Sequence, residues 1–520
     1  MQSIEQIIED DFHVIPDLLK SAALRHPDHC ALRAGDDSIS YADLDHLVDA
    51  VASRLQHDGL TPGQVVAICA RTCIRYVAVY FGALRAGGVV APLPVTAKVE
   101  HLDAMLDNCQ AKWLFTDSTI QSEWACLQTR QHIRQITLDD DDGAMPFSDW
   151  IAAAGQVTPV SISPEHPFNL IYSSGTTGVP KGIVQPHGMR WSHVKRAWLN
   201  GYRPDSVVIT GTPLYSNTTL VAVIPALVIG ATVIMLEKFD ALKYLQLAAK
   251  YRATHTILVP IQYQRILRHP QFDDFDLSCF KGKLCTSAPF SAELKAEVLD
   301  RWPGDLVEIY GMTEGGGRCE LHAHLYRDKL HTVGKPAPGC EIRIIDDNGN
   351  EVPQGELGEV VGRSPAMMHG YHGLPDKTRE AEWYSPEGLR FIRTGDVGRF
   401  DADGFLILGD RKKDMLISGG FNIYPSDLEA ELMKHPAVRD CAVVGVKSER
   451  WGETPVGFVV LDEKYSIDPE DLLQWVNQRL GKIQRLAKLE VVNDLPRNPI
   501  GKVLKRDLRE DFQQRYGTLA

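Results

Sequence analysis

The chain has 520 residues, and its 55 Lys and Arg against 68 Asp and Glu give a formal net charge of −13. With 44% hydrophobic and 24% charged residues, its composition is that of a globular protein. This excludes a collagen-like repeat, a largely disordered chain and a small disulfide-stapled scaffold. The acidic balance argues against a nucleic acid or an anionic membrane surface as a partner, because both need a basic face.

The first twenty residues are acidic and amphipathic, and they lack the basic and apolar regions of a secretory signal. Ten cysteines are scattered along the chain without any CxxC pair. Both features predict a cytoplasmic protein with reduced thiols.

Residues 20–120 alternate between helical and strand patterns, and the same rhythm returns at 240–300. We expect helices over 40–59, 76–87, 241–253 and 291–303, and strands over 65–70, 89–93 and 255–260. Strands that are separated by helices predict parallel sheets with right-handed crossovers.

Residues 206–236 carry no charge and are long enough to cross a bilayer. A polar loop at 211–217 interrupts them, and we expect Pro225 and Gly230 to divide the second apolar part before a final strand. Buried strands and helices of an α/β core explain this pattern, so we expect no transmembrane segment.

From residue 340 to 410 the pattern changes to short strands with turn dipeptides, which predicts an antiparallel or barrel-like region. After Lys413 we expect a small α/β unit with helices over 425–436 and 469–481 and strands over 441–446 and 456–461. The predicted fold is therefore α/β. It has a large N-terminal domain, 1–412, with parallel α/β sheets and a distorted β-barrel, and a small mobile α+β domain, 413–520.

The segment from Tyr172 to Gly182, YSSGTTGVPKG, holds four hydroxyl side chains, three glycines and Lys181 directly after an apolar run. Glycines allow backbone N–H groups to face a polyanion, and hydroxyls and a lysine add donors and charge. It is not a Walker A loop, because Gly182 and not Ser or Thr follows the lysine. The plain alternative is a flexible turn.

This segment resembles the phosphate-binding signature of the adenylate-forming (ANL) superfamily, which comprises acyl- and aryl-CoA ligases, luciferases and peptide-synthetase adenylation domains. Three further motifs follow in that family's order and extend the resemblance over essentially the whole chain. They are Tyr310-Gly-Met-Thr-Glu314, Arg393-Thr-Gly-Asp396 with Gly404–Arg411, and Asn498-Pro-Ile-Gly-Lys502.

The resemblance implies ATP, Mg²⁺ and coenzyme A as the cofactors and co-substrates. It implies that Ser173, Ser174, Gly175, Thr176, Thr177 and Lys181 hold phosphates, that Tyr310 stacks on adenine, that Asp396 contacts the ribose, and that Arg411 contacts the ribose or a phosphate. Thr313 would contact the α-phosphate, Glu314 would hold Mg²⁺, and Lys502 would reach the α-phosphate and the carboxylate. Lys413 would be the hinge, and Ser418, Gly419 and Gly420 would line the tunnel for the pantetheine of CoA.

The acyl pocket departs from the family pattern. Ser216 stands where relatives carry a His, and Thr286 and Ser287 stand where they often carry glycines. The residues expected to line this pocket are Tyr215, Val221, Ser287, Gly315 and Gly316. An apolar tail or an aromatic ring fits these side chains, whereas no Lys or Asp is placed to bind the charged ends of an amino acid.

These observations predict an ATP-dependent carboxylate–CoA ligase for a fatty, aryl or arylalkanoic acid. One rival is an enzyme that loads an acyl group onto a carrier protein, and another is a luciferase-like oxygenase. A third rival is a non-enzymatic nucleotide-binding protein, in which we would expect catalytic residues to be missing. The key lysines and carboxylates are present in this chain. The spacing of Cys319, His322, His324 and His331 fits no zinc template, and a homodimer is compatible with the sequence.

Overall fold

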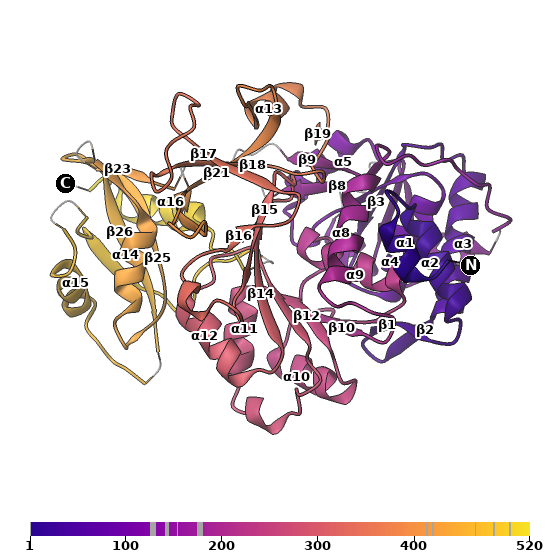
Figure 1. Cartoon of the computed structure of the whole chain (residues 1–520), viewed down its shortest axis with the longest axis horizontal. Coiled ribbons are helices and arrows are strands. Elements are labelled where there is room, and N and C mark those ends of the chain that lie inside the picture. Colours follow the sequence, from indigo (N-terminus) through magenta and orange to yellow (C-terminus); the bar gives the residue numbers. More distant parts are fainter. Residues whose placement is uncertain are drawn as a thin grey trace. The chain divides into compact units, whose positions relative to one another are not determined.

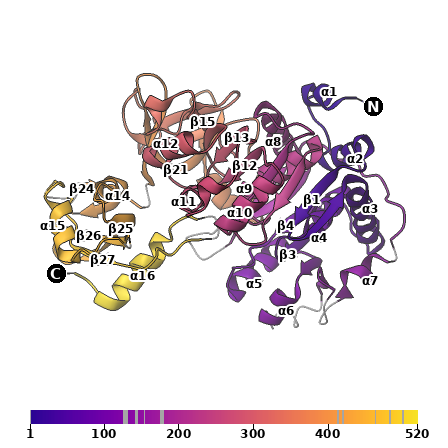
Figure 2. The same ribbon diagram turned by 90° about the horizontal axis from the view of Figure 1, so that it is seen from below.

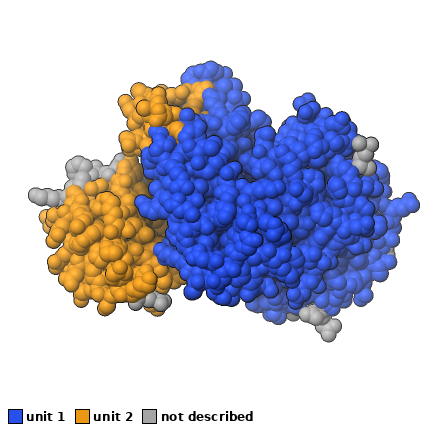
Figure 3. All heavy atoms as spheres, turned by 60° about the horizontal axis from the view of Figure 1, so that its bottom comes forward, with its two compact units in different colours: residues 1–341, 362–392 blue, residues 342–361, 393–520 orange. Residues whose placement is uncertain are grey.

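The computed structural model describes residues 2–124, 132–140, 145–152, 154–173, 180–411, 414–418, 421–462, 464–481, 484–498 and 501–519; the side chains of 173, 410, 411, 421 and 422 lie outside that description. Two compact units form (Figure 3): Met1–Glu341 with Gly362–Ile392, and Ile342–Val361 with Arg393–Ala520. The predicted domain boundary at 412/413 falls on residues outside the description and stays a prediction.

The first unit contains a nine-stranded sheet in the order β16-β15-β14-β13-β12-β10-β11-β1-β2. Six neighbouring strands, from β14 to β1, run parallel, whereas β2, β15 and β16 are antiparallel to their neighbours. The bounds are β1 Cys30–Ala34, β2 Asp37–Ser40, β10 Val207–Thr210, β11 Thr232–Met235, β12 His255–Leu258, β13 Gly282–Cys285, β14 Asp305–Gly311, β15 Arg318–His322 and β16 Lys335–Pro336.

A second sheet of the same unit has eight strands in the order β19-β9-β8-β4-β3-β5-β6-β7. Its parallel part runs from β8 to β7, and β9 returns antiparallel to β8. The bounds are β3 Val65–Cys69, β4 Val89–Pro92, β5 Trp113–Thr116, β6 Arg134–Thr137, β7 Met145–Pro146, β8 Pro167–Ser173, β9 Lys181–Pro186 and β19 Gly370–Tyr371.

Helices lie between the two sheets and bury a common core with both (Figure 1). They are α2 Ile15–Arg25, α3 Tyr41–His57, α4 Ile74–Arg85, α8 His187–Leu199 and α9 Asn217–Ile229. Other helices of the unit are α1 Ile4–Glu9, α5 Val99–Cys109, α6 Ser118–Glu123, α7 Phe147–Ile151, α10 Ala241–Lys250, α11 Pro260–Leu267, α12 Ala292–Arg301 and α13 Pro375–Glu380. The predicted helix over 40–59 corresponds to α3, whose N-cap Ser40 accepts a hydrogen bond from the Asp43 N–H.

The uncharged stretch 206–236 folds as strand β10, helix α9 and strand β11, as expected for a buried α/β core. One detail of the prediction is wrong: Pro225 lies inside α9, and only Gly230, in the left-handed region, ends that helix. Pro225 is buried among apolar neighbours, so tertiary packing tolerates it within the helix. Within the described residues, no helix is both long and apolar enough to cross a membrane.

Residues 341–411 contribute the five strands of one sheet over the segment predicted to be barrel-like, in the order β17-β18-β21-β20 with β22 paired to β21, and β21 runs antiparallel to β20 and β22. Its strands are β17 Glu341–Ile345, β18 Gly358–Arg363, β20 Glu382–Tyr384, β21 Arg390–Phe400 and β22 Leu406–Arg411. The second unit holds a separate sheet of β23 Leu416–Ser418, β24 Phe421–Ile423, β25 Val438–Ser448, β26 Gly452–Leu461 and β27 Lys488–Val491. The predicted fold class is therefore confirmed.

Alternate residues of β25 and β26 face two separate cores in the second unit. One face packs against α14 Pro425–Met433 and α15 Pro469–Asn477, and the other packs against α16 Lys505–Tyr516 (Figure 2). This two-sided arrangement makes the C-terminal segment a small α+β body with its own hydrophobic cores.

Candidate active site

The predicted phosphate loop joins two paired strands, β8 and β9, in which Ser173 stands opposite Lys181. Loop residues Ser174, Gly175, Thr176 and Thr177, and the side chain of Ser173, lie outside the described part of the chain, so their phosphate-binding roles remain predictions. The strand pairing brings the two ends of the loop together at one edge of the eight-stranded sheet.

Polar contacts anchor the base of this hairpin. The Tyr172 hydroxyl lies 2.8 Å from Asn108 Oδ1 and 3.1 Å from the Met105 carbonyl oxygen. A Cβ at Gly182, opposite Tyr172 in the ladder, would lie 3.2 Å from the Asn108 side chain and from the Tyr172 ring. The glycine after Lys181 is therefore explained by close packing as well as by its place in the motif.

Lys181 and Glu314 meet at the side chain of Tyr371. The Lys181 ammonium lies 5.3 Å from the centre of the Tyr371 ring, and the Tyr371 hydroxyl donates to Glu314 Oε1 at 2.9 Å. Burial and the Glu314 carboxylate raise the pKa of the Tyr371 phenol, so that it stays a hydrogen-bond donor. Strand β19 places Tyr371 opposite Ile183 of β9.

The adenine motif follows the buried strand β14. Tyr310 is half-buried and stands opposite Cys319 of β15, and Thr313 and Glu314 lie in the turn beyond the strand. The Glu314 carbonyl accepts the Met368 N–H at 2.8 Å, which ties this turn to the segment that leads into β19. The structure therefore brings Lys181, Glu314 and the adenine motif to neighbouring strand ends of one unit.

Close packing dictates the two glycines that were expected to line the acyl pocket. Gly315 has a φ of +78°, and a Cβ there would lie 1.9 Å from the Ala366 carbonyl oxygen. A Cβ on Gly316 would lie 2.4 Å from the Cβ of Ile392. Both positions require glycine for the fold, so their role as an acyl-pocket wall remains a separate prediction.

The remaining acyl-pocket positions gather around the start of α9. Ser216 is the N-cap of α9, and its hydroxyl accepts the Thr218 N–H at 3.2 Å, which gives this departure from the family pattern a structural role. The Thr218 and Ser287 hydroxyls lie 2.7 Å apart, and Ser287 has a φ of +79°. Tyr215 and Val221 are half-buried on the same segment, and burial raises the pKa of Tyr215 to about 12.

In the second unit, the register of β21 and β22 pairs Asp396 with Arg411. The Asp396 N–H donates to the Thr394 hydroxyl at 3.0 Å, and that hydroxyl donates to the Val360 carbonyl at 2.7 Å. Asp396 is half-buried, and the side chain of Arg411 is not described. The backbone register thus brings the two predicted ribose contacts to opposite positions of one ladder.

Two hydrogen bonds join Lys502 to Asn498. The Asn498 side chain accepts the Lys502 N–H at 2.9 Å, and the Asn498 N–H donates to the Lys502 carbonyl at 2.9 Å. Arg497 donates to the Gly501 carbonyl at 2.6 Å and to Asp440 at 2.5 Å. These contacts hold the backbone of Lys502, with Gly501 in the left-handed region at φ +76°.

The hinge and pantetheine motif is described only at Ser418, which is buried at the end of β23 and paired with Phe421 and Gly452. Lys413, Gly419 and Gly420 lie outside the described residues, so their predicted roles remain predictions.

Comparison with protein-family models identifies the family of this chain. Residues 19–372 match the model described as "AMP-binding enzyme", and residues 427–502 match "AMP-binding enzyme C-terminal domain". The chain belongs to the AMP-binding enzyme family, of the acyl- and aryl-CoA ligase type. It is therefore an adenylate-forming enzyme that uses ATP and a carboxylic acid.

Similarity to individual members of the AMP-binding enzyme family extends over nearly the whole chain. A feruloyl-CoA synthase of an Amycolatopsis species is 33% identical over 491 residues, which cover 94% of this chain and 96% of the relative. A fatty acid–[acyl-carrier-protein] ligase, ScoC, of Streptomyces coeruleorubidus is 29% identical over 488 residues, 91% of this chain and 92% of the relative. The structure of ATP-bound MatB from Rhodopseudomonas palustris has a TM-score of 0.86 at 29% identity and covers 96% and 99% of the two chains.

Sequence reasoning missed Tyr371, the contact that joins Lys181 to Glu314 in this AMP-binding enzyme. Its one signal in the sequence is the Gly370-Tyr371 pair between the adenine motif and the ribose motif. No local pattern shows that this short strand returns to pair with β9, because the two segments are almost 190 residues apart.

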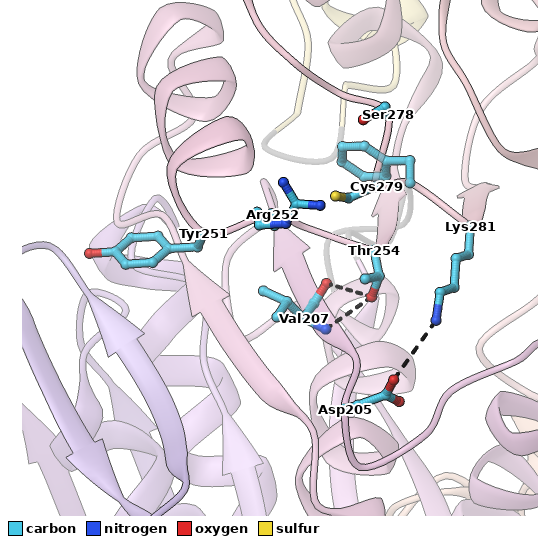
Figure 4. A pocket seen from close by; sticks show the side chains of 9 residues that line it. Asp205, Val207, Tyr251, Arg252, Thr254, Ser278, Cys279 and Lys281 are labelled. Atoms are coloured by element: carbon cyan, nitrogen blue, oxygen red, sulfur yellow. Dashed lines mark hydrogen bonds and ion pairs between the residues drawn. The ribbon is translucent and has the colours of Figure 1, made fainter.

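A surface hollow of about 420 Å³ lies away from these motifs (Figure 4). It opens at the amino ends of β10, β12 and β13, whereas the predicted acyl-pocket residues Tyr215 and Ser287 follow the carboxyl ends of β10 and β13. Thr254 contacts the Val207 backbone there, and Lys281 lies 3.9 Å from Asp205. None of the predicted site residues lines this hollow. No three His, Cys, Asp or Glu side chains gather as a metal site in the described part of the chain.

Proposed function

We propose that this enzyme is an ATP-dependent acid–CoA ligase that converts a fatty, aryl or arylalkanoic acid to its acyl-adenylate and then to its acyl-CoA. The observation that carries the proposal is the meeting of Lys181 and Glu314 at Tyr371. It brings a phosphate-binding cation and a carboxylate of the kind that binds Mg²⁺ to one place, at the strand ends where the adenine motif also lies.

In the first half-reaction a carboxylate oxygen attacks the α-phosphorus of ATP. The bond from the α-phosphorus to the bridging oxygen breaks, and pyrophosphate leaves with the electron pair. The reactants repel each other because both are anionic, so catalysis consists mainly of positioning and charge neutralisation. Lys181 is suited to neutralise the phosphates, and Thr313 and Tyr310 are suited to hold the α-phosphate and adenine.

Glu314 fits a magnesium ion that arrives with the nucleotide. Its Oε1 accepts the Tyr371 hydroxyl, which orients a carboxylate of the kind that binds a hard cation. Mg²⁺ commonly takes one or two protein carboxylates together with substrate phosphates, and it supplies charge neutralisation on the phosphate oxygens when bound.

Asp396 and Arg411 are proposed to bind the ribose, and Lys502 to neutralise the attacking carboxylate and the α-phosphate. The turn that holds the backbone of Lys502 supports this role, because it limits the freedom of the residue that must carry the charge. In the second half-reaction the CoA sulfur attacks the acyl carbonyl carbon, the bond to AMP breaks, and the thiol proton passes to water.

The acid is proposed to be fatty or aromatic because Tyr215 and Val221 offer apolar contact surface. The relatedness to a feruloyl-CoA synthase supports an aryl acid, and the relatedness to ScoC, a fatty acid–[acyl-carrier-protein] ligase, supports a fatty acid. The same relatedness to ScoC favours one alternative acceptor, the phosphopantetheine of an acyl carrier protein.

The deciding experiment measures pyrophosphate release over a panel of fatty, cinnamic and phenylalkanoic acids, with CoA or a holo-carrier protein as acceptor. The proposal predicts acid-dependent release and an acyl-CoA product. Turnover with the carrier protein alone would assign the alternative function, and absence of any acid-dependent release would refute both.

A variant separates the two half-reactions. Lys502→Ala should abolish adenylation yet still convert a supplied acyl-adenylate to the thioester. Equal loss of both half-reactions would refute the division of labour assigned to Lys502.

A further inference from the structure

A fully buried arginine lies within the first unit, close to the adenine motif. Arg190 of α8 is 1% exposed, and burial lowers its pKa only to about 10, so that it remains charged at neutral pH. No Asp or Glu forms an ion pair with it in the part of the chain that the structure describes. Burying a charge without a counter-charge is costly, so the chain must gain something from keeping this guanidinium.

Neutral side chains from three elements surround the guanidinium. Its Nε donates to Asn169 Oδ1 of β8 at 3.1 Å, and its Nη2 donates to Gln185 Oε1 of β9 at 2.5 Å. Its Nη1 lies 3.4 Å from Nδ1 of His193, a histidine whose pKa is lowered by burial and then by neighbouring arginines. Neutral side chains contact all three nitrogens of Arg190, but they leave its net charge uncompensated.

The guanidinium also determines how the Gln185 amide is oriented. Arginine can only donate hydrogen bonds, so the oxygen of Gln185 must face Arg190 and the NH₂ group must face away. That NH₂ group donates to the Thr313 carbonyl at 2.7 Å and lies 3.5 Å from Asn217 Oδ1. Gln185 itself is completely buried.

One amide therefore links two functional segments. Thr313 belongs to the adenine motif, and Asn217 is the first residue of α9, directly after the acyl-pocket residues. Holding the Thr313 carbonyl fixes the peptide that precedes Glu314. Through Gln185, the positive charge of Arg190 is also linked to Thr313, the residue proposed to contact the α-phosphate where it reacts with the carboxylate.

We propose that Arg190 and Gln185 are positioning residues for the adenylation step. Gln185 holds the Thr313 peptide in its reactive orientation, and Arg190 fixes the Gln185 amide and supplies a permanent positive charge to the site. This inference rests on the proposed function, since it assumes that Thr313 contacts the α-phosphate. A charge held in a buried site acts strongly on nearby anions and needs no rearrangement during the reaction.

The test compares four variants in acid-dependent exchange of pyrophosphate into ATP. Arg190→Met removes the charge, whereas Arg190→Lys keeps it. Gln185→Leu removes the donor to Thr313, and Gln185→Glu keeps a partner for Arg190 but turns an acceptor toward the Thr313 carbonyl. We expect the kcat of exchange to fall about tenfold to hundredfold in Arg190→Met, Gln185→Leu and Gln185→Glu, with partial recovery in Arg190→Lys.

The matched control is Arg203→Met. Arg203 follows α8 and donates to the carbonyls of Trp198 and Tyr202 at 2.7 Å, away from the motifs, so its loss should lower the melting temperature without lowering kcat. A purely structural role for Arg190 would give the same outcome as this control, and that result would overturn the proposal. If Arg190→Met fails to fold, Gln185→Glu decides, because it keeps Arg190 and gives its guanidinium a carboxylate partner.

Two results distinguish this inference from the proposed function. Absence of exchange in the wild type with every acid would refute the proposed function. Wild-type exchange with an unchanged kcat in folded Gln185→Glu and Arg190→Met would refute the positioning role alone. Conversion of a supplied acyl-adenylate to the thioester should change less than exchange in all four variants, and an equal loss would contradict a role specific to adenylation.

Discussion

The phenolic hydroxyl of Tyr371 donates a hydrogen bond to Glu314 Oε1 at 2.9 Å, across 57 residues of sequence. The ring of the same side chain lies 5.3 Å from the ammonium of Lys181. Tyr371 thus contacts a cation with its face and an anion with its hydroxyl, and it brings the two to neighbouring positions.

Tyr371→Phe should keep the ring beneath Lys181 but release the Glu314 carboxylate. Because partners that orient a metal-binding carboxylate are typically worth about tenfold to hundredfold in affinity, we expect the Mg²⁺ concentration for half-maximal pyrophosphate exchange to rise by that factor. Tyr384→Phe is the matched control, since Tyr384 contacts Glu382 at 3.2 Å on the surface. Equal responses of the two variants would contradict the role of Tyr371.

Gly315→Ala should destabilise the first unit by more than about 3 kcal/mol, because a methyl group would collide with the Ala366 carbonyl and force a left-handed alanine. Gly388 has the same φ of +78° with nothing within 4 Å of a Cβ, so Gly388→Ala should cost only about 1 kcal/mol. Urea unfolding of both variants measures the difference. Similar losses would show that the backbone relaxes around position 315.

Asp396→Asn should raise the KM for ATP about tenfold or more, because hydrogen bonds to a charged carboxylate are stronger than those to an amide. The control is Asp401→Asn, in which an amide oxygen can still accept the N–H groups of Asp403 and Phe405 that Asp401 now accepts at 2.9 and 2.8 Å. Steady-state kinetics with varied ATP make the comparison. An unchanged KM in Asp396→Asn would remove this residue from the ribose site.

Acid should destabilise the first unit through His255 of β12. Burial, and then the charge of Lys281, lowers the pKa of His255 from 6.5 to about 4. The unfolded chain therefore takes up this proton first, so stability that is present above pH 6.5 is lost as the pH falls to 4, by on the order of 3 kcal/mol. His255→Phe should flatten this part of the stability–pH profile from urea unfolding, and a profile parallel to the wild type would contradict the assignment.

The local alternation of helix and strand could be predicted from the sequence, because apolar residues recur at different spacings in helices and in strands. Helix α3, strand β3 and the strands of the 206–236 stretch lie where the pattern places them. The phosphate loop follows β8 of the eight-stranded sheet and the adenine motif lies at the end of β14 of the nine-stranded sheet, so strand order within one sheet does not predict that the two motifs meet.

Contacts between distant segments could not be predicted in the same way. The return of Tyr371 to β9 depends on strand pairing over a long separation, and Pro225 stays helical because its surroundings in the core outweigh its local preference. From its residue type alone, Ser216 was only a departure from the family pattern of the acyl pocket. Its position as the N-cap of α9 became visible only with the helix that it begins.

Strand β14 carries an acidic side chain two residues before Tyr310. Glu308 is 4% exposed and forms an ion pair with Lys295 of α12, whose ammonium also donates to the carbonyls of Leu330 and Thr332. A slip of β14 by one residue would turn Glu308 to the opposite face of the sheet and leave Lys295 without its anion. The buried pair therefore fixes the register of β14, the strand that carries Tyr310, because a one-residue shift of this strand would leave a buried charge unpaired.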